Sequence, residues 1–384
     1  MKTEWDMHFA ESGHEALKIM ATAPFDVVVS DMRMPVMDGA QFLYKVMKQY
    51  PQSVRIILSG QSEKEIVLKS VGPTHQYLAK PCDSQTLINT IKRACALRGI
   101  LNEEPLKSLI SRMGSLPSLP SLYIEIIEEL RSPSSSINRV GDIISRDIGM
   151  TAKVLQLVNS AFFGLPQHVS TPAQAVRLLG LDTIRGLVLT VNIFSRFKKI
   201  GINGFSLDRL RDHSLVTAVF AREIAGEEVD DPKVIEDSFL VGIMHDVGRI
   251  VLAAMLPEKY EKVLELMHRE NKDIFEVEKR IFRATHAEVG AYLLGLWGLP
   301  QFIVEAVCYH HYPARSSTFQ FSPLTAVHVA NAVEKIFYSG NGKLQIDAEY
   351  LTKIGLIDRL PGWKNICHKA AERRNLYESK DPLR

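Results

Sequence analysis

The apolar segments of this 384-residue chain change in kind near residue 105. Before that point, short runs rich in β-branched residues alternate with longer amphipathic stretches; the runs are 25–30, 54–59 and 76–79. Continuous apolar strands that alternate with helices are typical of a parallel sheet covered by helices. After that point the chain has long amphipathic segments and no clear strand pattern. We therefore expect an α/β layer followed by an all-α domain.

Helical patterns and their end signals divide the chain further. The predicted helices are 12–22, 38–49, 62–71, 84–97, 121–131, 137–146, 149–160, 172–180, 182–197 and a block over 207–336. Asp231 followed by Pro232 indicates a helix start. The capping box Thr285-His-Ala-Glu288 places His286 in the first turn of its helix. Gly99 and Pro105 are expected to end the helix 84–97 and to leave a short linker.

Composition excludes several classes of protein. Hydrophobic residues make up 46% and charged residues 23%, and 46 Lys and Arg against 44 Asp and Glu give a net charge of +2, so no strongly basic nucleic-acid surface is indicated. The four cysteines form no CxxC pair, which argues against a disulfide scaffold or zinc ribbon and suits a reducing cytoplasm. No uninterrupted apolar run approaches the ~18 residues of a membrane span, and the N-terminus lacks the apolar region of a signal peptide.

Three polar side chains are expected at the carboxyl ends of the three strands. Asp31 ends the run Val27-Val-Val-Ser-Asp31, Ser59 ends the second run, and Lys80 follows the third. Ligand sites of open α/β sheets lie at this edge. A carboxylate with a hydroxyl and an ammonium beside it can accept a phosphoryl group and bind its oxygens. Taken alone, an Asp at a strand end would be an ordinary turn residue.

In these residues the N-terminal part resembles the receiver domain of two-component response regulators. The resemblance implies that Asp31 is the phosphoacceptor, Ser59 the switch hydroxyl, Tyr77 the switch aromatic residue and Lys80 the invariant lysine. It also implies a flavodoxin-like fold over 1–98, a cis Lys80–Pro81 peptide bond, and a sensor histidine kinase as partner.

The chain departs from the receiver pattern at its start. Receivers begin with a central strand that ends in an acidic pair for Mg²⁺, whereas this chain opens at what resembles the second strand, Trp5–Ala10. We therefore expect a receiver without its first strand and first helix. Because Mg²⁺ needs carboxylate ligands and Asp31 alone supplies too few, Mg²⁺ binding by the receiver is in doubt. Either the start codon lies upstream or the metal site has been lost.

The helical block carries polar residues in otherwise apolar helices. In Gly242-Ile-Met-His-Asp-Val-Gly248, an imidazole stands next to a carboxylate, which is a recognised pair of metal ligands. Any one histidine would more often be a hydrogen-bonded core or surface residue. The ordered set makes a metal site the stronger interpretation. Its members are His213, His245, Asp246, His286, His310 and His311.

This set resembles the HD superfamily of metal-dependent phosphohydrolases, and within it the HDOD branch. Supporting motifs are Leu116-Pro-Ser-Leu-Pro120, Ala175-Val-Arg-Leu-Leu-Gly180 and Trp297-Gly-Leu-Pro300. The implied divisions are a linker over 99–111, an HDOD domain over 112–335 and a helical tail over 336–384.

In the enzymes of this superfamily, His213, His245, Asp246 and a later Asp would hold a metal ion. Asn331 stands at the position of that Asp, and Arg249 at that of a lysine. His286, His310 and His311 match the extra ligands of HD-GYP relatives, but the Gly-Tyr-Pro signature is missing. Iron, manganese or zinc is therefore expected to be weakly held or absent.

Two functions of different classes follow. The first is a response regulator and phosphoprotein whose receiver controls a non-catalytic HDOD domain that acts through protein contacts. The alternative is a metal-dependent phosphodiesterase acting on a cyclic dinucleotide or another phosphoester. Asn331 and Arg249 favour the first. Expected partners are a histidine kinase and a downstream protein in the cytoplasm, with no membrane and, since no helix-turn-helix is recognisable, no direct DNA contact. A homodimer is left open.

Overall fold

The computed structural model describes most of the chain. The described residues are 5–59, 74–111, 129, 132, 134, 136–145, 172–181, 202–296, 300–339 and 344–373. They form two compact units, Met1–Ser121 with Tyr292–Leu299, and Leu122–Ala291 with Pro300–Arg384. The units are described separately below.

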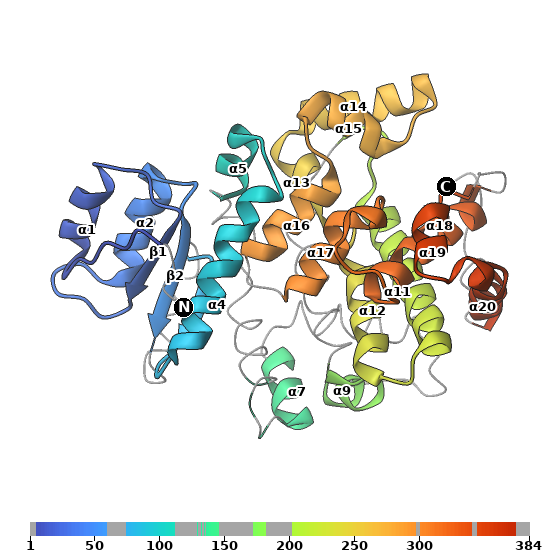
Figure 1. Cartoon of the computed structure of the whole chain (residues 1–384), viewed down its shortest axis with the longest axis horizontal. Coiled ribbons are helices and arrows are strands. Elements are labelled where there is room, and N and C mark those ends of the chain that lie inside the picture. Colours follow the sequence, from blue (N-terminus) through green and yellow to red (C-terminus); the bar gives the residue numbers. More distant parts are fainter. Residues whose placement is uncertain are drawn as a thin grey trace. The chain divides into compact units, whose positions relative to one another are not determined.

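The first unit is built on a parallel three-stranded sheet in the order β1-β2-β3. Its strands are β1 Val27–Asp31, β2 Val54–Ser59 and β3 Gln76–Ala79, and its helices are α1 Gly13–Met20, α2 Gly39–Gln49 and α4 Ser84–Ala96. In Figure 1, α1 and α2 lie on one side of the strands and α4 on the other. All three predicted strands are confirmed, with β1 starting two residues late and reaching Asp31.

One sequence prediction for this sheet is wrong. The segment Trp5–Ala10 forms no strand, and the Phe9 side chain is 84% exposed. β1 pairs with β2 on one edge, and no described strand pairs with its other edge. An extended segment without a neighbour forms no ladder of hydrogen bonds, so the apolar pattern of residues 5–10 does not suffice to make a strand.

The predicted linker contains a helix, α5 Glu104–Ser111. Helix α4 ends before Gly99 as predicted, but Pro105 lies in the first turn of α5, where a missing N–H is tolerated. The fully buried guanidinium of Arg55 on β2 donates to the Ser111 carbonyl at 2.6 Å. A cation at a helix C-terminus satisfies a free carbonyl and matches the helix dipole, so the end of α5 is fixed to the sheet.

The regular elements that the structure describes in the second unit are all helices. The helices are α7 Ile137–Ser145, α9 Pro172–Leu179, α11 Leu207–Glu228, α12 Pro232–Met244, α13 Val247–Met255, α14 Pro257–Glu270, α15 Ile274–Phe282, α16 His286–Leu296 (which ends in the first unit), α17 Gln301–Tyr309, α18 Pro323–Ser339, α19 Ala348–Lys353 and α20 Leu360–Arg373. The predicted all-α domain is confirmed. The helices expected at 62–71, 121–131, 149–160 and 182–197, and the motifs at 116–120 and 297–299, lie outside the described residues.

The apolar stretch Pro232–Met255 is long enough to cross a membrane by length and composition. However, 82% of its most apolar window is buried inside the protein. The two helices of this stretch, α12 and α13, are separated at His245 and Asp246. This burial is typical of helices in the core of a folded domain.

Two glycines allow the helices of the second unit to approach closely. A Cβ atom on Gly242 would lie 2.5 Å from the Ala218 Cα atom, and one on Gly248 would lie 1.9 Å from the His286 carbonyl oxygen. Only glycine fits at such distances. Gly242 therefore lets α12 contact α11, and Gly248 lets α13 contact the start of α16. The residues between the two glycines, His245 and Asp246 among them, therefore lie close to both α11 and α16.

We predict that Gly248→Ala destabilises the protein by at least the ~1–3 kcal/mol typical of overpacking, because the added methyl group meets backbone atoms. Urea denaturation followed by helical circular dichroism measures this. Gly362→Ala in α20 is the matched control, since a Cβ there meets nothing within 4 Å, and it should be neutral or slightly stabilising. Equal stability of the two variants would contradict the packing argument.

Candidate functional site

The receiver residues gather at the carboxyl end of the sheet. Asp31 ends β1, and Lys80 directly follows β3, with its Nζ atom 2.5 Å from the Asp31 Oδ2 atom. Both side chains are 40% exposed, so the carboxylate is accessible from solvent. The Lys80–Pro81 peptide bond is cis, as predicted. Ser59 ends β2 between the two other strands, whereas the Tyr77 side chain lies outside the described part of the chain.

Asp31 has few neighbours that could help it to bind a cation. In the described part of the chain, no group of three His, Cys, Asp or Glu side chains includes Asp31. Its strong partner is Lys80, which is itself a cation. Weak Mg²⁺ binding by the receiver therefore stays a prediction.

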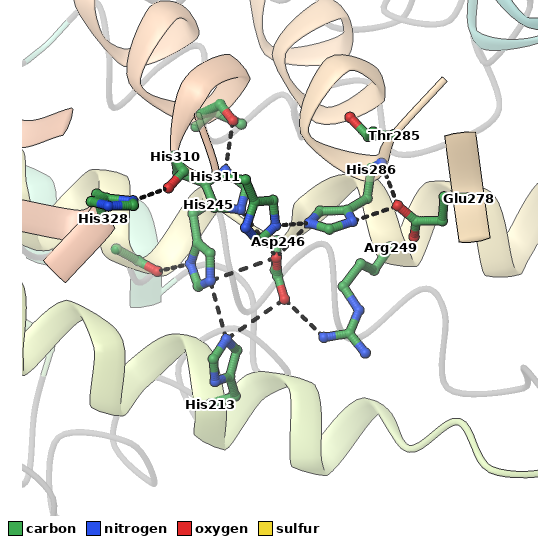
Figure 2. A network of polar contacts seen from close by, with 12 residues as sticks. His213, His245, Asp246, Arg249, Glu278, Thr285, His286, His310, His311 and His328 are labelled. Atoms are coloured by element: carbon green, nitrogen blue, oxygen red, sulfur yellow. Dashed lines mark hydrogen bonds and ion pairs between the residues drawn. The ribbon is translucent and has the colours of Figure 1, made fainter. Parts of the chain in front are cut away.

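The second unit brings all six predicted metal-ligand candidates together around Asp246 (Figure 2). They come from the second turn of α11, the α12–α13 junction, the start of α16 and the end of α17. The capping box of Thr285 and Glu288 is present, so His286 begins α16 as predicted. The centre is buried, with His245 and His310 fully covered.

The two oxygens of Asp246 face different partners. Its Oδ1 atom lies 3.1 Å from His286 Nε2, 3.6 Å from His245 Nε2 and 3.8 Å from His310 Nε2. Its Oδ2 atom lies 3.6 Å from His213 Nε2 and 2.9 Å from Arg249 Nη1.

Asp246 thus belongs to two groups of candidate ligands, in each of which the ligand atoms lie within 4.8 Å of one another. The three-residue group is His213, His245 and Asp246, and the four-residue group is Asp246, His286, His310 and His311.

Two histidines at helix C-termini are oriented by carbonyl groups one turn earlier. The Nδ1 atom of His245 donates to the Gly242 carbonyl, and that of His310 to the Val307 carbonyl, both at 2.7 Å. A carbonyl oxygen only accepts, so each Nδ1 carries the proton and each Nε2 turns a lone pair toward the centre. Burial lowers the pKa of His245 to about 4, which keeps it neutral.

Two carboxylates that the sequence analysis missed orient the other histidines. Glu334 Oε2 lies 2.7 Å from His213 Nδ1, and Glu278 Oε2 lies 2.6 Å from His286 Nδ1. Carboxylates in this position are the usual outer partners of metal-ligating histidines. The sequence did contain a signal for Glu334, because an acidic residue is unusual in a helix as apolar as α18. Glu278 lies in a charged helix, where no pattern distinguishes it.

Charge pairing dominates the titration of this centre. Burial opposes protonation of His286, but the carboxylates of Glu278 and Asp246 outweigh it and raise its pKa to about 9. Burial also opposes ionisation of Asp246, yet His245, His286 and Arg249 hold its pKa well below the usual value. At neutral pH, a protonated His286 therefore lies between two carboxylates, and an ion that binds here must displace that proton.

The donor set fits a divalent metal ion. His310 Nε2 and Asn331 Oδ1 are buried atoms for which the described residues provide no hydrogen-bond partner. Several imidazole lone pairs, that of His310 among them, converge on the Asp246 carboxylate, a set that suits zinc, manganese or iron.

A cavity of about 300 Å³ gives access to this centre. His310, His311 and Asn331 lie in its wall together with Phe275 and Lys335. A cavity of this volume is at the small end of ligand sites in proteins. His328 in the same wall supports the centre indirectly, because its Nδ1 atom donates to the His310 carbonyl.

Comparison with known families identifies both parts of the chain. The HDOD domain matches residues 116–313, and the response regulator receiver domain matches residues 2–92. The chain is thus a signal-transduction protein of the response regulator class. It belongs to the HDOD family and carries an N-terminal receiver domain, as the sequence motifs indicated.

The matches to individual relatives cover only part of each relative's length. An uncharacterized protein of Treponema pallidum is 27% identical over 53% of this chain and 39% of its own. The hydrogenase transcriptional regulatory protein HoxA of Cupriavidus necator is 30% identical over 33% of this chain and 26% of its own. This chain thus spans less than half the length of either.

A solved structure supports the fold over most of the chain. An HDOD domain protein of unknown function from Geobacter sulfurreducens is 25% identical, with a TM-score of 0.55. The match covers 76% of this chain and 98% of that protein.

We predict that Glu278→Gln weakens binding of Mn²⁺ or Zn²⁺ by about 10–100-fold, because the amide no longer supports His286 as a ligand. Equilibrium dialysis measures the change. Glu270→Gln is the matched control, since Glu270 pairs with Arg280 on the surface, and it should leave metal affinity unchanged. An equal loss in both variants would argue against a role for Glu278 in the centre.

Proposed function

We propose that this protein is a two-component response regulator whose receiver controls an HDOD domain that acts through protein contacts rather than by catalysis. The two matched domains support this pairing of input and output. Receiver domains accept a phosphoryl group from a histidine kinase, and Asp31 is the proposed acceptor. Lys80, Ser59 and Tyr77 would then respond to the phosphoryl group. The proposed setting is the cytoplasm, with an unidentified downstream protein and no direct DNA contact.

The ion pair between Arg249 and Asp246 carries the non-catalytic part of this proposal. Arg249 Nη1 lies 2.9 Å from Asp246 Oδ2 inside the centre, so a permanent cation of the chain occupies one of the carboxylate oxygens. Asn331 offers a neutral amide where the enzymes of the superfamily use a carboxylate. Both differences weaken a metal-dependent hydrolytic site.

A metal-dependent phosphodiesterase is the second candidate function, and one observation favours it. His213, His245, His286 and His310 each have Nδ1 held by an oxygen atom and Nε2 turned toward Asp246. Buried histidines oriented in this way are typical of functional metal centres. The alternative substrates are a cyclic dinucleotide or another phosphoester.

Hydrolysis assays on the metal-loaded protein distinguish the two functions. We predict weak metal occupancy and no turnover of a cyclic dinucleotide above background with Fe²⁺, Mn²⁺ or Zn²⁺. Steady hydrolysis that is lost in His245→Ala, but kept in the exposed control His368→Ala, would establish the enzyme instead. Elemental analysis of the same samples reports whether metal is bound.

Phosphoryl transfer tests the receiver. We predict little labelling of the 384-residue chain by a small phosphodonor with Mg²⁺, because Asp31 alone supplies too few ligands for the ion. Adding a preceding strand that ends in two acidic residues should restore labelling.

Labelling should then disappear in Asp31→Ala and persist in Asp6→Ala, the control at a carboxylate that is 93% exposed. Strong labelling of the unextended chain at Asp31 would show that no further acidic residues are needed.

A further inference from the structure

The two groups of candidate ligands at Asp246 are unequal. The four-residue group offers one carboxylate oxygen and three imidazoles, which is the number of ligands in a closed tetrahedral site. The three-residue group offers one carboxylate and two imidazoles. A fourth ligand there would have to come from elsewhere. Ligand number alone therefore favours the four-residue group.

Arg249 also makes the three-residue group the weaker site, because it donates a hydrogen bond to one oxygen of the shared carboxylate. Its Nη1 atom donates to Asp246 Oδ2, the oxygen on the His213 side, at 2.9 Å. The Oδ1 atom instead faces the Nε2 atoms of the histidines, with that of His286 at 3.1 Å. Figure 2 shows the guanidinium approaching Asp246 from the side opposite His310 and His311.

The guanidinium is held in place by its surroundings. Its Nε atom donates to the hydroxyl of Tyr260 at 3.3 Å, and the Tyr260 side chain is fully buried. Arg249 lies in the first turn of α13, three residues after Asp246, and its side chain is 24% exposed. Moving it away from Asp246 would break both hydrogen bonds.

A divalent ion and this guanidinium compete for the same carboxylate oxygen, Asp246 Oδ2. A metal ion binds a carboxylate oxygen at about 2.0–2.2 Å. An ion on Oδ2 would therefore lie within about 5 Å of Arg249 Nη1, where two cations repel each other strongly in a buried site. Unlike a lysine, arginine cannot lose its charge to relieve that repulsion.

We propose that Arg249 restricts the centre to a single metal ion, held by the four-residue group, and excludes an ion from the three-residue group. This inference extends the proposed function by giving a reason for the lack of catalysis, since a pair of ions clamping a phosphoester could not form. It concerns binding only, and so it can fail separately from the proposed function.

Metal stoichiometry of the full chain tests the inference. The protein is dialysed to equilibrium against excess Mn²⁺, so that a weakly held ion is also counted, and the electron paramagnetic resonance spectrum of the bound ion is recorded. At saturating Mn²⁺ the wild type should hold one ion per chain, with the spectrum of isolated Mn²⁺. Arg249→Gln should approach two ions and show an exchange-coupled pair, with second-site affinity raised at least about tenfold.

Two further arginine variants separate charge from structure. Arg249→Lys replaces a permanent cation by one that can lose its proton, so it should admit a second ion more readily than the wild type and less readily than Arg249→Gln. Arg280→Gln removes a surface arginine paired with Glu270 and should match the wild type.

Tyr260→Phe is a second test if Arg249→Gln folds poorly. It removes the hydroxyl that holds the guanidinium and preserves the shape of the side chain. The second ion should then bind with partial occupancy.

Histidine variants locate the single ion. His311→Ala should remove it, whereas His213→Ala should leave it in place. The reverse pattern, two ions or none in the wild type, or one ion in both Arg249→Gln and Tyr260→Phe would overturn the inference. One ion together with hydrolysis of a phosphoester would overturn the proposed function and leave the inference standing.

Discussion

The helical domain is organised around one buried carboxylate, that of Asp246. A buried anion is costly unless several partners compensate it. Here an arginine, a protonated histidine and further imidazoles surround it, and they come from four different helical segments. Because every partner must reach the same two oxygens, the positions of these segments depend on one another. The centre is thus a structural constraint before it is a functional one.

The short motif around His245 and Asp246 shows how the sequence meets this constraint. The helix ends at His245, which frees the chain to turn both side chains inward. The glycines at either end of the motif allow backbone-to-backbone contact with two other helices. Polar residues alone would not assemble the centre, since helix axes usually stay 8–10 Å apart when side chains separate them. The glycines and the ligand pair therefore act as one unit.

Much of the fold and part of the site could be predicted from the sequence. Apolar periodicity was enough for three strands and the helical block, and the histidine and aspartate motifs that resemble the HD superfamily named all six candidate ligands. The strand at Trp5–Ala10 was wrong because strand formation depends on a neighbour, which local pattern does not report. Glu278 and Glu334 were missed because an acid that orients a histidine has no spacing rule relative to it. Such pairs exist only in the folded structure.

The charges at the centre explain how this domain can fold without a metal ion. Arg249 on one oxygen and protonated His286 on the other already neutralise Asp246, and Glu278 shares the proton-bearing imidazole. Under the proposed non-catalytic function, the histidines contribute packing and hydrogen bonding. An enzyme needs the opposite arrangement, in which the ion itself completes the charge balance. In the proposed non-catalytic function, a permanent cation next to the shared carboxylate keeps the domain in the first arrangement.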